Sequence, residues 1–137
     1  MRRVMVLCGH SYVVLGTVDA TGEMRETVVA GFMSKGADDD YWGQFGIPVT
    51  GTVGVVQLDF TRRPAARFRI VVSKVEYYRV VREIYRLSKT WTTYEVLLQN
   101  CNSFVGQIAA SVGLRTPLVA AQFPVRYVTE LRALNSR

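Results

Sequence analysis

The chain has 137 residues, of which 49% are hydrophobic and 20% are charged, and its formal net charge is +6. This composition excludes a disordered chain and predicts one domain, residues 1–137, large enough to bury a core. No apolar run approaches the roughly 18 residues of a membrane-spanning helix. Arg and Lys are dispersed along the chain, so the charge does not indicate a specific nucleic-acid partner.

The N-terminus, Met1-Arg2-Arg3 followed by an apolar run, is similar to the start of a secretion signal. Gly9-His10-Ser11 interrupts that run before any cleavage site, and we interpret residues 4–7 as an edge strand. We therefore expect a cytoplasmic protein, with an exported effector or a fragment of a longer protein as alternatives. The oligomeric state is left open.

The chain contains two cysteines, Cys8 and Cys101, and one histidine, His10. Two cysteines do not make the disulfide framework of a small secreted scaffold. One histidine without a closely spaced set of ligands argues against a structural zinc site. We expect neither a metal nor a cofactor.

The first half of the chain predicts strands. Residues 10–17 and 27–33 are rich in β-branched residues and flank the turn residues Asp19–Gly22, which indicates a hairpin. Residues 52–60 and 67–72 are two further strands. The segment 34–51 between them is long for a structureless loop, and such loops are often functional. Its Tyr41 and Trp42 are either core residues or substrate contacts.

The second half predicts three helices. Ser73-Lys74-Val75-Glu76 is a capping box, and Asn100 is a good N-cap for a second helix that stops at Gly113. Pro124 opens a third helix. Strands followed by helices predict an α+β domain, with an antiparallel sheet of four to five strands packed against helices. The apolar faces are Tyr77, Val81, Ile84, Leu87 and Trp91, then Cys101, Phe104, Val105, Ile108, Ala109 and Val112, then Tyr127, Val128, Leu131 and Leu134.

Cys101 lies in the first turn of the second predicted helix, where the macrodipole and free amides favour an anion. Asn100 and Asn102 flank it, and both are unusually polar for the core side of a helix start. The alternative is a buried structural thiol, which is common for cysteine. His10 could take the thiol proton if the fold brings the two residues together.

Two segments carry a family resemblance: Gly9–Val14, which contains His10, and Tyr94–Val105, which contains Asn100-Cys101-Asn102-Ser103-Phe104. In order and spacing the chain resembles the circularly permuted papain-like thiol hydrolases. These include the PPPDE peptidases, the lecithin:retinol acyltransferase-like enzymes and permuted NlpC-type cell-wall endopeptidases. The resemblance implies a permuted papain-like core, with Cys101 as nucleophile and His10 as general base.

The next predicted strand after the one that begins at His10, residues 27–33, is almost wholly apolar. Many papain-like enzymes carry on that strand a polar group that orients the histidine. The site is then either a Cys-His dyad or takes its orienting residue from elsewhere, with Ser11, Gln57 and Asp59 as candidates. The acyltransferase group also has a histidine on that strand, and this chain has none.

These residues predict a cysteine peptidase or amidohydrolase that cleaves a peptide, isopeptide or cell-wall amide through a thioester. Amides at the helix start would hold the oxyanion, with Asn100, Gln99 and Ser11 in support. The alternatives are a lipid acyltransferase or thioesterase using the same dyad, and a non-catalytic binding module with a basic face.

Cys8 lies two residues before His10. If one strand carried both, they would share a face of it and Cys8 could come close to Cys101. Oxidation would then silence the enzyme reversibly through a Cys8–Cys101 disulfide. The alternative is that Cys8 simply packs in the sheet.

Overall fold

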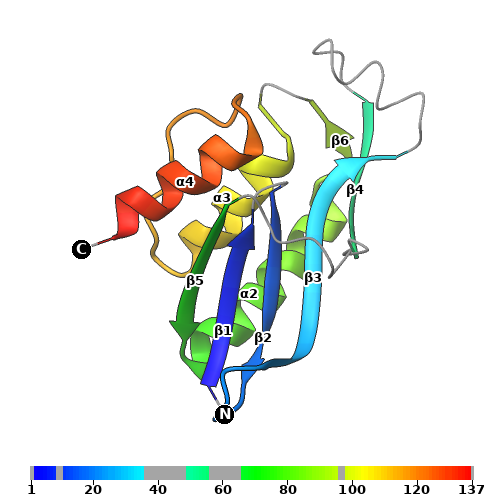
Figure 1. The fold of residues 1–137 in the computed structure, drawn as a ribbon. Coiled ribbons are helices and arrows are strands. Elements are labelled where there is room, and N and C mark those ends of the chain that lie inside the picture. Colours follow the sequence, from blue (N-terminus) through cyan, green and yellow to red (C-terminus); the bar gives the residue numbers. More distant parts are fainter. Residues whose placement is uncertain (1, 9–10, 36–48, 56–65, 96–97, 137) are drawn as a thin grey trace.

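The computed structural model describes residues 2–8, 11–35, 49–55, 66–95 and 98–136. Within these ranges the chain forms one six-stranded sheet, in which every neighbouring pair is antiparallel and the order is β5-β1-β2-β3-β4-β6. The helices pack against this sheet (Figure 1), which confirms the α+β prediction. The strands are β1 (Arg2–Cys8), β2 (Tyr12–Val18), β3 (Met24–Ser34), β4 (Val49–Val55), β5 (Arg67–Val72) and β6 (Thr93–Tyr94), and the helices are α2 (Lys74–Thr90), α3 (Cys101–Ser111) and α4 (Pro124–Asn135).

The N-terminal strand was expected at an edge, and this expectation is wrong. β1 lies between β5 and β2 and pairs with both. Val4, Met5, Val6 and Leu7 are all buried, so both faces of β1 are covered, as a continuous apolar run requires. Among the described strands the edges are β5 and the two-residue β6, a strand too short to produce a sequence pattern.

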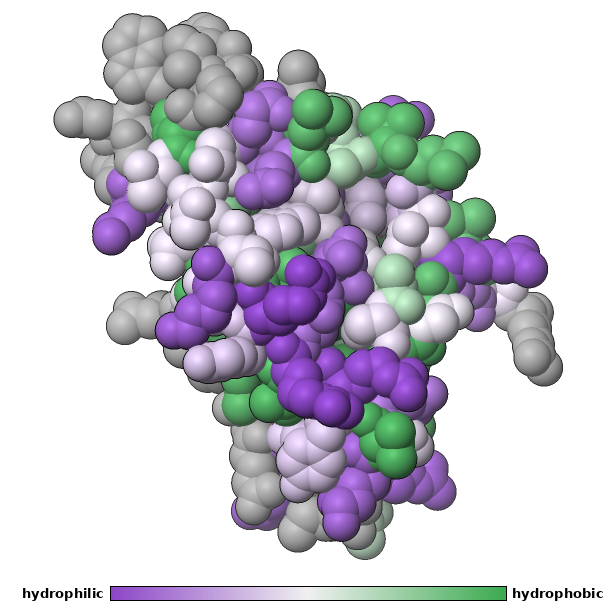
Figure 2. Space-filling view, turned by 180° about the vertical axis from the view of Figure 1, so that it is seen from behind, coloured by the Kyte–Doolittle hydropathy of each residue, from purple (hydrophilic) through white to green (hydrophobic). Residues whose placement is uncertain are grey.

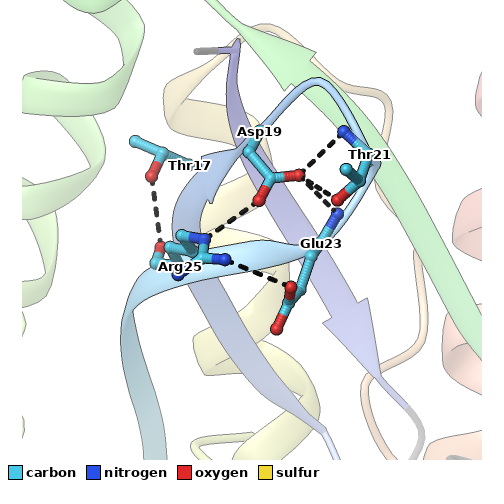
Figure 3. Close-up of polar contacts among 5 residues, drawn as sticks. All are labelled: Thr17, Asp19, Thr21, Glu23 and Arg25. Atoms are coloured by element: carbon cyan, nitrogen blue, oxygen red, sulfur yellow. Dashed lines mark hydrogen bonds and ion pairs between the residues drawn. The ribbon is translucent and has the colours of Figure 1, made fainter.

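The predicted hairpin is confirmed as β2 and β3, joined by the turn around Asp19. The Asp19 carboxylate accepts hydrogen bonds from the Thr21 backbone and hydroxyl and from the Glu23 backbone, at 2.5–3.1 Å. Its second oxygen meets Arg25 Nε at 2.9 Å (Figure 3). These bonds lower the pKa of Asp19 from 3.8 to about 2, with the Thr21 hydroxyl as the largest cause. The turn therefore satisfies its polar groups within seven residues of sequence.

The helix ends follow their predicted signals. Ser73 and Glu76 form the reciprocal capping box of α2, Pro124 stands in the first turn of α4, and Gly113 takes a positive φ of 80° directly after α3. One position of the apolar stripe on α2 is corrected, because Val80 is fully buried and Val81 is exposed.

The main core lies between the sheet and the helices. α3 crosses β2 and β3, whereas α4 lies against β5 and β1 (Figure 1). The C-terminal helix buries three of the four residues predicted for it, but Leu134 is exposed at its last turn. The fully buried core residues include Met5, Leu7, Val13, Leu15, Val80, Leu87, Phe104, Val105, Ile108 and Leu131.

A chain of aromatic rings closes the core near β6. Phe32 stacks on Tyr94 at 5.5 Å between centroids and meets Trp91 edge-on at 5.3 Å, and Trp91 meets Phe104 at 6.3 Å. Gly51 faces this cluster, where an added Cβ would collide with the Phe32 ring. The stacking fixes the Tyr94 ring beside the start of α3.

Candidate functional site

The first turn of α3 is fixed by Asn100, as predicted. The Asn100 side chain accepts a hydrogen bond from the Ser103 backbone N–H at 2.9 Å, and the Ser103 hydroxyl accepts one from the Asn100 N–H at 2.7 Å. Asn100 Nδ2 also donates to the carbonyl of Ala120 at 3.1 Å. The reciprocal cap sets the helix start immediately before Cys101.

Cys101 is the first residue of α3 and is a free, partly buried thiol. Four groups that can hydrogen-bond to its sulfur act on the pKa of the thiol: the hydroxyls of Ser11 and Tyr94, and the backbone N–H groups of Cys101 and Asn102. Three separate elements, the start of β2, β6 and α3, therefore meet at one sulfur atom. The N–H groups of Cys101 and Asn102 lie in the first turn of α3, and amides at a helix start are the kind of donor that can form an oxyanion hole.

Burial raises the pKa of the Cys101 thiol above its ordinary value of 9.0, and hydrogen-bonding groups near the sulfur, among them the Asn102 N–H and the Tyr94 hydroxyl, offset only part of this increase. The expected bias toward thiolate is therefore not the net result. Desolvation of the charged form outweighs the helix terminus. At neutral pH the thiol rests protonated, so any nucleophilic attack needs a base in that step.

Ser11 stands directly before β2 in a left-handed conformation, with φ at 49°. A non-glycine residue rarely adopts this region, and it does so where the surroundings over-determine it. Ser11 is almost completely buried, and its hydroxyl donates a hydrogen bond to Oδ1 of Asn102. The strained backbone thus turns a hydroxyl from the end of the sheet toward the first turn of α3.

Asn102, also buried, uses every polar atom of its side chain. Its amide nitrogen donates to the carbonyls of Ala120 at 2.9 Å and Gln122 at 2.7 Å, and its Oδ1 accepts from Ser11. These contacts fix the orientation of the amide, because only the nitrogen can donate to the two carbonyls. Asn102 therefore links the α3–α4 connection to the Ser11 turn.

This orientation decides the direction of the hydrogen bond at the sulfur. A hydroxyl has one hydrogen, and that of Ser11 is committed to Asn102. The remaining lone pairs of Ser11 can accept the S–H of Cys101, which suits a neutral thiol. Donation from Ser11 to a thiolate would require the hydroxyl to leave Asn102, so ionisation of Cys101 has an extra cost in this network.

Of the other predicted support residues, Gln99 has a structural role. Its side-chain amide donates to the Thr93 carbonyl at 2.7 Å, and its backbone exchanges two hydrogen bonds with Glu95. These contacts close the loop between β6 and α3. His10, Gln57, Asp59, Tyr41 and Trp42 lie outside the described residues.

The condition set for Cys8, that one strand run from it through His10, is not met by the described residues. Cys8 ends β1 and pairs across the sheet with Tyr12, the first residue of β2, so no continuous strand runs from Cys8 through Tyr12. Tyr12 belongs to the face turned away from the helices. The left-handed φ of Ser11 breaks the alternation at that point, so strand parity does not assign His10 to either face. A Cys8–Cys101 disulfide stays a prediction.

Two residues at the sulfur were absent from the predicted site. Tyr94 appeared only as part of the resemblance, and Asn102 only as an unusually polar neighbour of Cys101. The signal for Asn102 was its place on the core side of a helix, where a buried amide must find partners. Nothing local in the sequence indicates that Tyr94 reaches Cys101, because this contact depends on ring stacking with Phe32.

Among the described residues, no group of three or more His, Cys, Asp or Glu side chains could hold a metal ion. The helices in the described ranges are too short or too polar to cross a membrane. No family model, no curated protein and no solved structure matches the chain.

Proposed function

We propose that the protein is a cysteine-dependent hydrolase that cleaves an amide or isopeptide bond, with a permuted papain-like core and Cys101 as nucleophile. The observation that carries the proposal is the polar setting of the Cys101 thiol: it opens a capped helix beside the buried Ser11–Asn102 hydrogen bond, and hydroxyls from two distant segments, those of Ser11 and Tyr94, act on its pKa. A thiol that served only as core packing would have no need of these polar neighbours.

In the proposed reaction, His10 takes the thiol proton as the sulfur attacks the substrate carbonyl carbon. The N–H groups of Cys101 and Asn102 stabilise the oxyanion of the tetrahedral intermediate. Collapse forms a thioester and expels the amine, which receives the proton from His10. Water, deprotonated by His10, then attacks the thioester, releases the carboxylic acid and returns the proton to the thiolate.

Ser11 and Tyr94 have supporting roles in this scheme. Because the Ser11 hydrogen is held by Asn102 in the resting state, the thiol stays neutral until a base removes its proton. Once the thiolate forms, the hydroxyls of Ser11 and Tyr94 stabilise it by donation. In this scheme Cys101 is a neutral thiol in the resting enzyme and is deprotonated only during attack, whereas a thiolate–imidazolium pair would be ionised at rest.

A second candidate is hydrolysis or transfer of an apolar acyl group from an ester or thioester, through the same thioester intermediate. It is favoured by one observation: large apolar side chains are exposed on the segments that flank the first turn of α3, among them Leu98 and Phe123. A site for an acyl chain requires apolar surface beside the nucleophile.

The test is trapping of the covalent intermediate. Purified protein is incubated with a panel of activated amides and of p-nitrophenyl esters with short and long acyl chains, and intact mass is measured after acid quenching. We expect one acyl adduct on Cys101, loss of the adduct in Cys101→Ala, and loss of about 10²–10⁴-fold in rate in His10→Ala. Cys8→Ser is the matched control and should retain full acylation.

Preference for amides supports the first candidate, and preference that grows with acyl length supports the second. A Cys101 that forms no adduct with any member of the panel, and alkylates more slowly than a free peptide thiol, would identify a non-catalytic binding module instead.

A further inference from the structure

The outward side of α2 carries alternating tyrosines and cations. Tyr78 is 51% exposed and Tyr85 is 66% exposed, and Arg82 and Lys89 are exposed as well. These residues follow one another at intervals of four, three and four positions, so they form one stripe along the helix. We call Tyr78, Arg82, Tyr85 and Lys89 the outer stripe. The helical period thus gathers on one side residues that are separated in the sequence.

The acidic residues of α2 lie on another side of the helix. Glu76 and Glu83 are spaced at helical intervals from the fully buried Val80, so they belong to the side nearer the core. Each carboxylate also has a partner: Glu76 accepts the Ser73 backbone N–H at 2.7 Å, and Glu83 accepts from Arg86 Nε at 3.1 Å. The two carboxylates therefore do not neutralise the outer stripe.

The elements around α2 add no negative charge to this side. The helix packs mainly against α3, β1, β4 and β5, and none of these four described elements contains Asp or Glu. Arg82 and Lys89 form no ion pair with any described residue. Figure 2 views the molecule from the side on which α2 covers the sheet, and strongly hydrophilic side chains cross the middle of that surface. A basic face along a helix, on a chain with a net charge of +6, is typical of nucleic-acid-binding proteins.

The tyrosines indicate which form of nucleic acid fits. Tyr78 and Tyr85 are seven positions apart, about 10.5 Å along the helix axis, and Arg82 lies between them. Lys89 Nζ lies 5.3 Å from the Tyr85 ring centroid, a cation–π contact that holds the ring at the surface. Bases stack on exposed aromatic rings while cations meet the phosphates, and this combination of contacts binds single strands. The bases of a duplex already stack on one another, so the outer stripe favours a single strand.

We propose that the outer stripe binds single-stranded nucleic acid without sequence specificity, with bases stacked on Tyr78 and Tyr85 and phosphates on Arg82 and Lys89. DNA and RNA single strands share this chemistry. The inference goes beyond the proposed function and does not depend on it, because it requires no reaction at Cys101.

The experiment is fluorescence anisotropy of labelled oligonucleotides titrated with the full chain. The probes are oligodeoxythymidine and oligouridine of about 20 nucleotides and a blunt DNA duplex of the same length. We expect both single strands to bind more tightly than the duplex, and the affinity to fall as the salt concentration rises. Tighter binding of oligouridine would assign the surface to RNA, and tighter binding of oligodeoxythymidine to DNA.

Two variants separate the phosphate contacts from the stacking. Arg82→Gln/Lys89→Gln should reduce the slope of log affinity against log salt by about 1.4, since each phosphate contact contributes about 0.7 for a single strand. Tyr78→Ser/Tyr85→Ser should leave that slope unchanged and lower the affinity by about fivefold or more for each ring. Tyr78→Phe/Tyr85→Phe keeps both rings and should bind as the wild type does.

The matched control for charge is Arg67→Gln/Arg69→Gln on β5. Both arginines are exposed, and they alternate with Phe68 and Ile70, which pack toward the core, so they lie on the opposite face of the sheet. This variant and Cys101→Ala should bind as the wild type does. Absence of binding at low salt, duplex bound as tightly as single strands, or equal loss in the stripe and control variants would overturn the proposal. Polyglutamate that competes as well as oligodeoxythymidine of equal charge would assign the stripe to acidic polypeptides and also overturn it.

Discussion

The two ends of β2 differ in where their polar groups find partners. At one end the Asp19 turn is exposed, and its carboxylate is satisfied by Thr21, Glu23 and Arg25 (Figure 3). At the other end Ser11 is buried, and its hydroxyl is satisfied by Asn102, 91 positions away. The first turn stabilises a hairpin on its own, whereas the second exists only in the folded domain.

The difference has an energetic consequence. A hydrogen bond in water is replaced cheaply when one partner is removed, since solvent takes its place. A buried polar group that loses its partner keeps the full cost of desolvation. Substitutions at the Ser11 end should therefore be costly and should act on both stability and the thiol, and those at the Asp19 end should be mild.

The largest effect is expected for Asn102→Ala. The substitution removes three hydrogen bonds and leaves the buried Ser11 hydroxyl and the carbonyls of Ala120 and Gln122 without this partner. We expect a loss of about 3 kcal/mol in the free energy of unfolding, measured by urea denaturation, and a Tm lowered by about 10 °C. Thr21→Ala is the matched control in the exposed turn and should change stability by less than about 0.5 kcal/mol. Equal effects of the two variants would contradict the comparison.

Next in size are two variants of Ser11. Both Ser11→Ala and Ser11→Gly remove the hydroxyl and leave Oδ1 of Asn102 without its donor, which should cost about 1–2 kcal/mol in unfolding free energy. Only Ser11→Ala keeps a Cβ at the positive φ of 49°. We therefore expect the glycine variant to be more stable than the alanine variant by about 1 kcal/mol. Equal stabilities would show that the left-handed backbone stores no strain.

The same contrast explains what could be predicted from the sequence. The capping box at Ser73 and Glu76, the cap at Asn100 and the turn at Asp19 were all predictable, because each is completed within a few residues. The stop at Gly113 was predictable for the same reason. These local signals, with the change from period 2 to period 3.6, were sufficient for the α+β class.

The parts that could not be predicted depend on the assembled fold. The choice between Val80 and Val81 on α2 depends on the exact rotation of the helix over the sheet. The contacts of Tyr94 and Ser11 with Cys101 join three segments distant in sequence. The pKa of Cys101 depends on the balance between burial, which raises it, and those contacts, which lower it. The position of Cys101 in the first helical turn, taken alone, predicted a lowered pKa.

The third prediction concerns pH and Cys101. The folded-state pKa of this thiol is raised, mainly by burial, above the value of 9.0. The unfolded chain therefore releases the thiol proton first as the pH rises, so the unfolded state binds fewer protons and stability falls above about pH 9. The loss continues until the folded thiol ionises. Cys101→Ala should remove this part of the alkaline destabilisation, measured by urea denaturation from pH 7 to pH 10.5.

Cys8→Ser is the matched control for this pH series and tests whether the alkaline loss belongs to Cys101 in particular. Tyr94→Phe removes a hydroxyl that lowers the pKa of Cys101. It should therefore shift the pH dependence of iodoacetamide alkylation to higher pH, in a Cys8→Ser background. A shift to lower pH would mean that the hydroxyl stabilises the thiol rather than the thiolate.

The smallest effect is expected at the exposed turn. The pKa of Asp19 is lowered from 3.8 to about 2 by its hydrogen bonds to Thr21 and Arg25. The carboxylate therefore stabilises the folded state fully above about pH 4, and the contribution disappears as the pH falls through about 2. The Asp19 side chain is 20% exposed and that of its partner Arg25 is 56% exposed, so salt and water screen this contribution, and Asp19→Asn should differ little from the wild type at neutral pH. NMR titration of the Asp19 carboxyl should give the lowered pKa in the wild type and a value near 3.8 in a Thr21→Ala/Arg25→Gln variant. If the variant kept the low pKa, the bonds to Thr21 and Arg25 would not be its cause. The claim that local partners satisfy the Asp19 carboxylate at this end of β2 would then be contradicted.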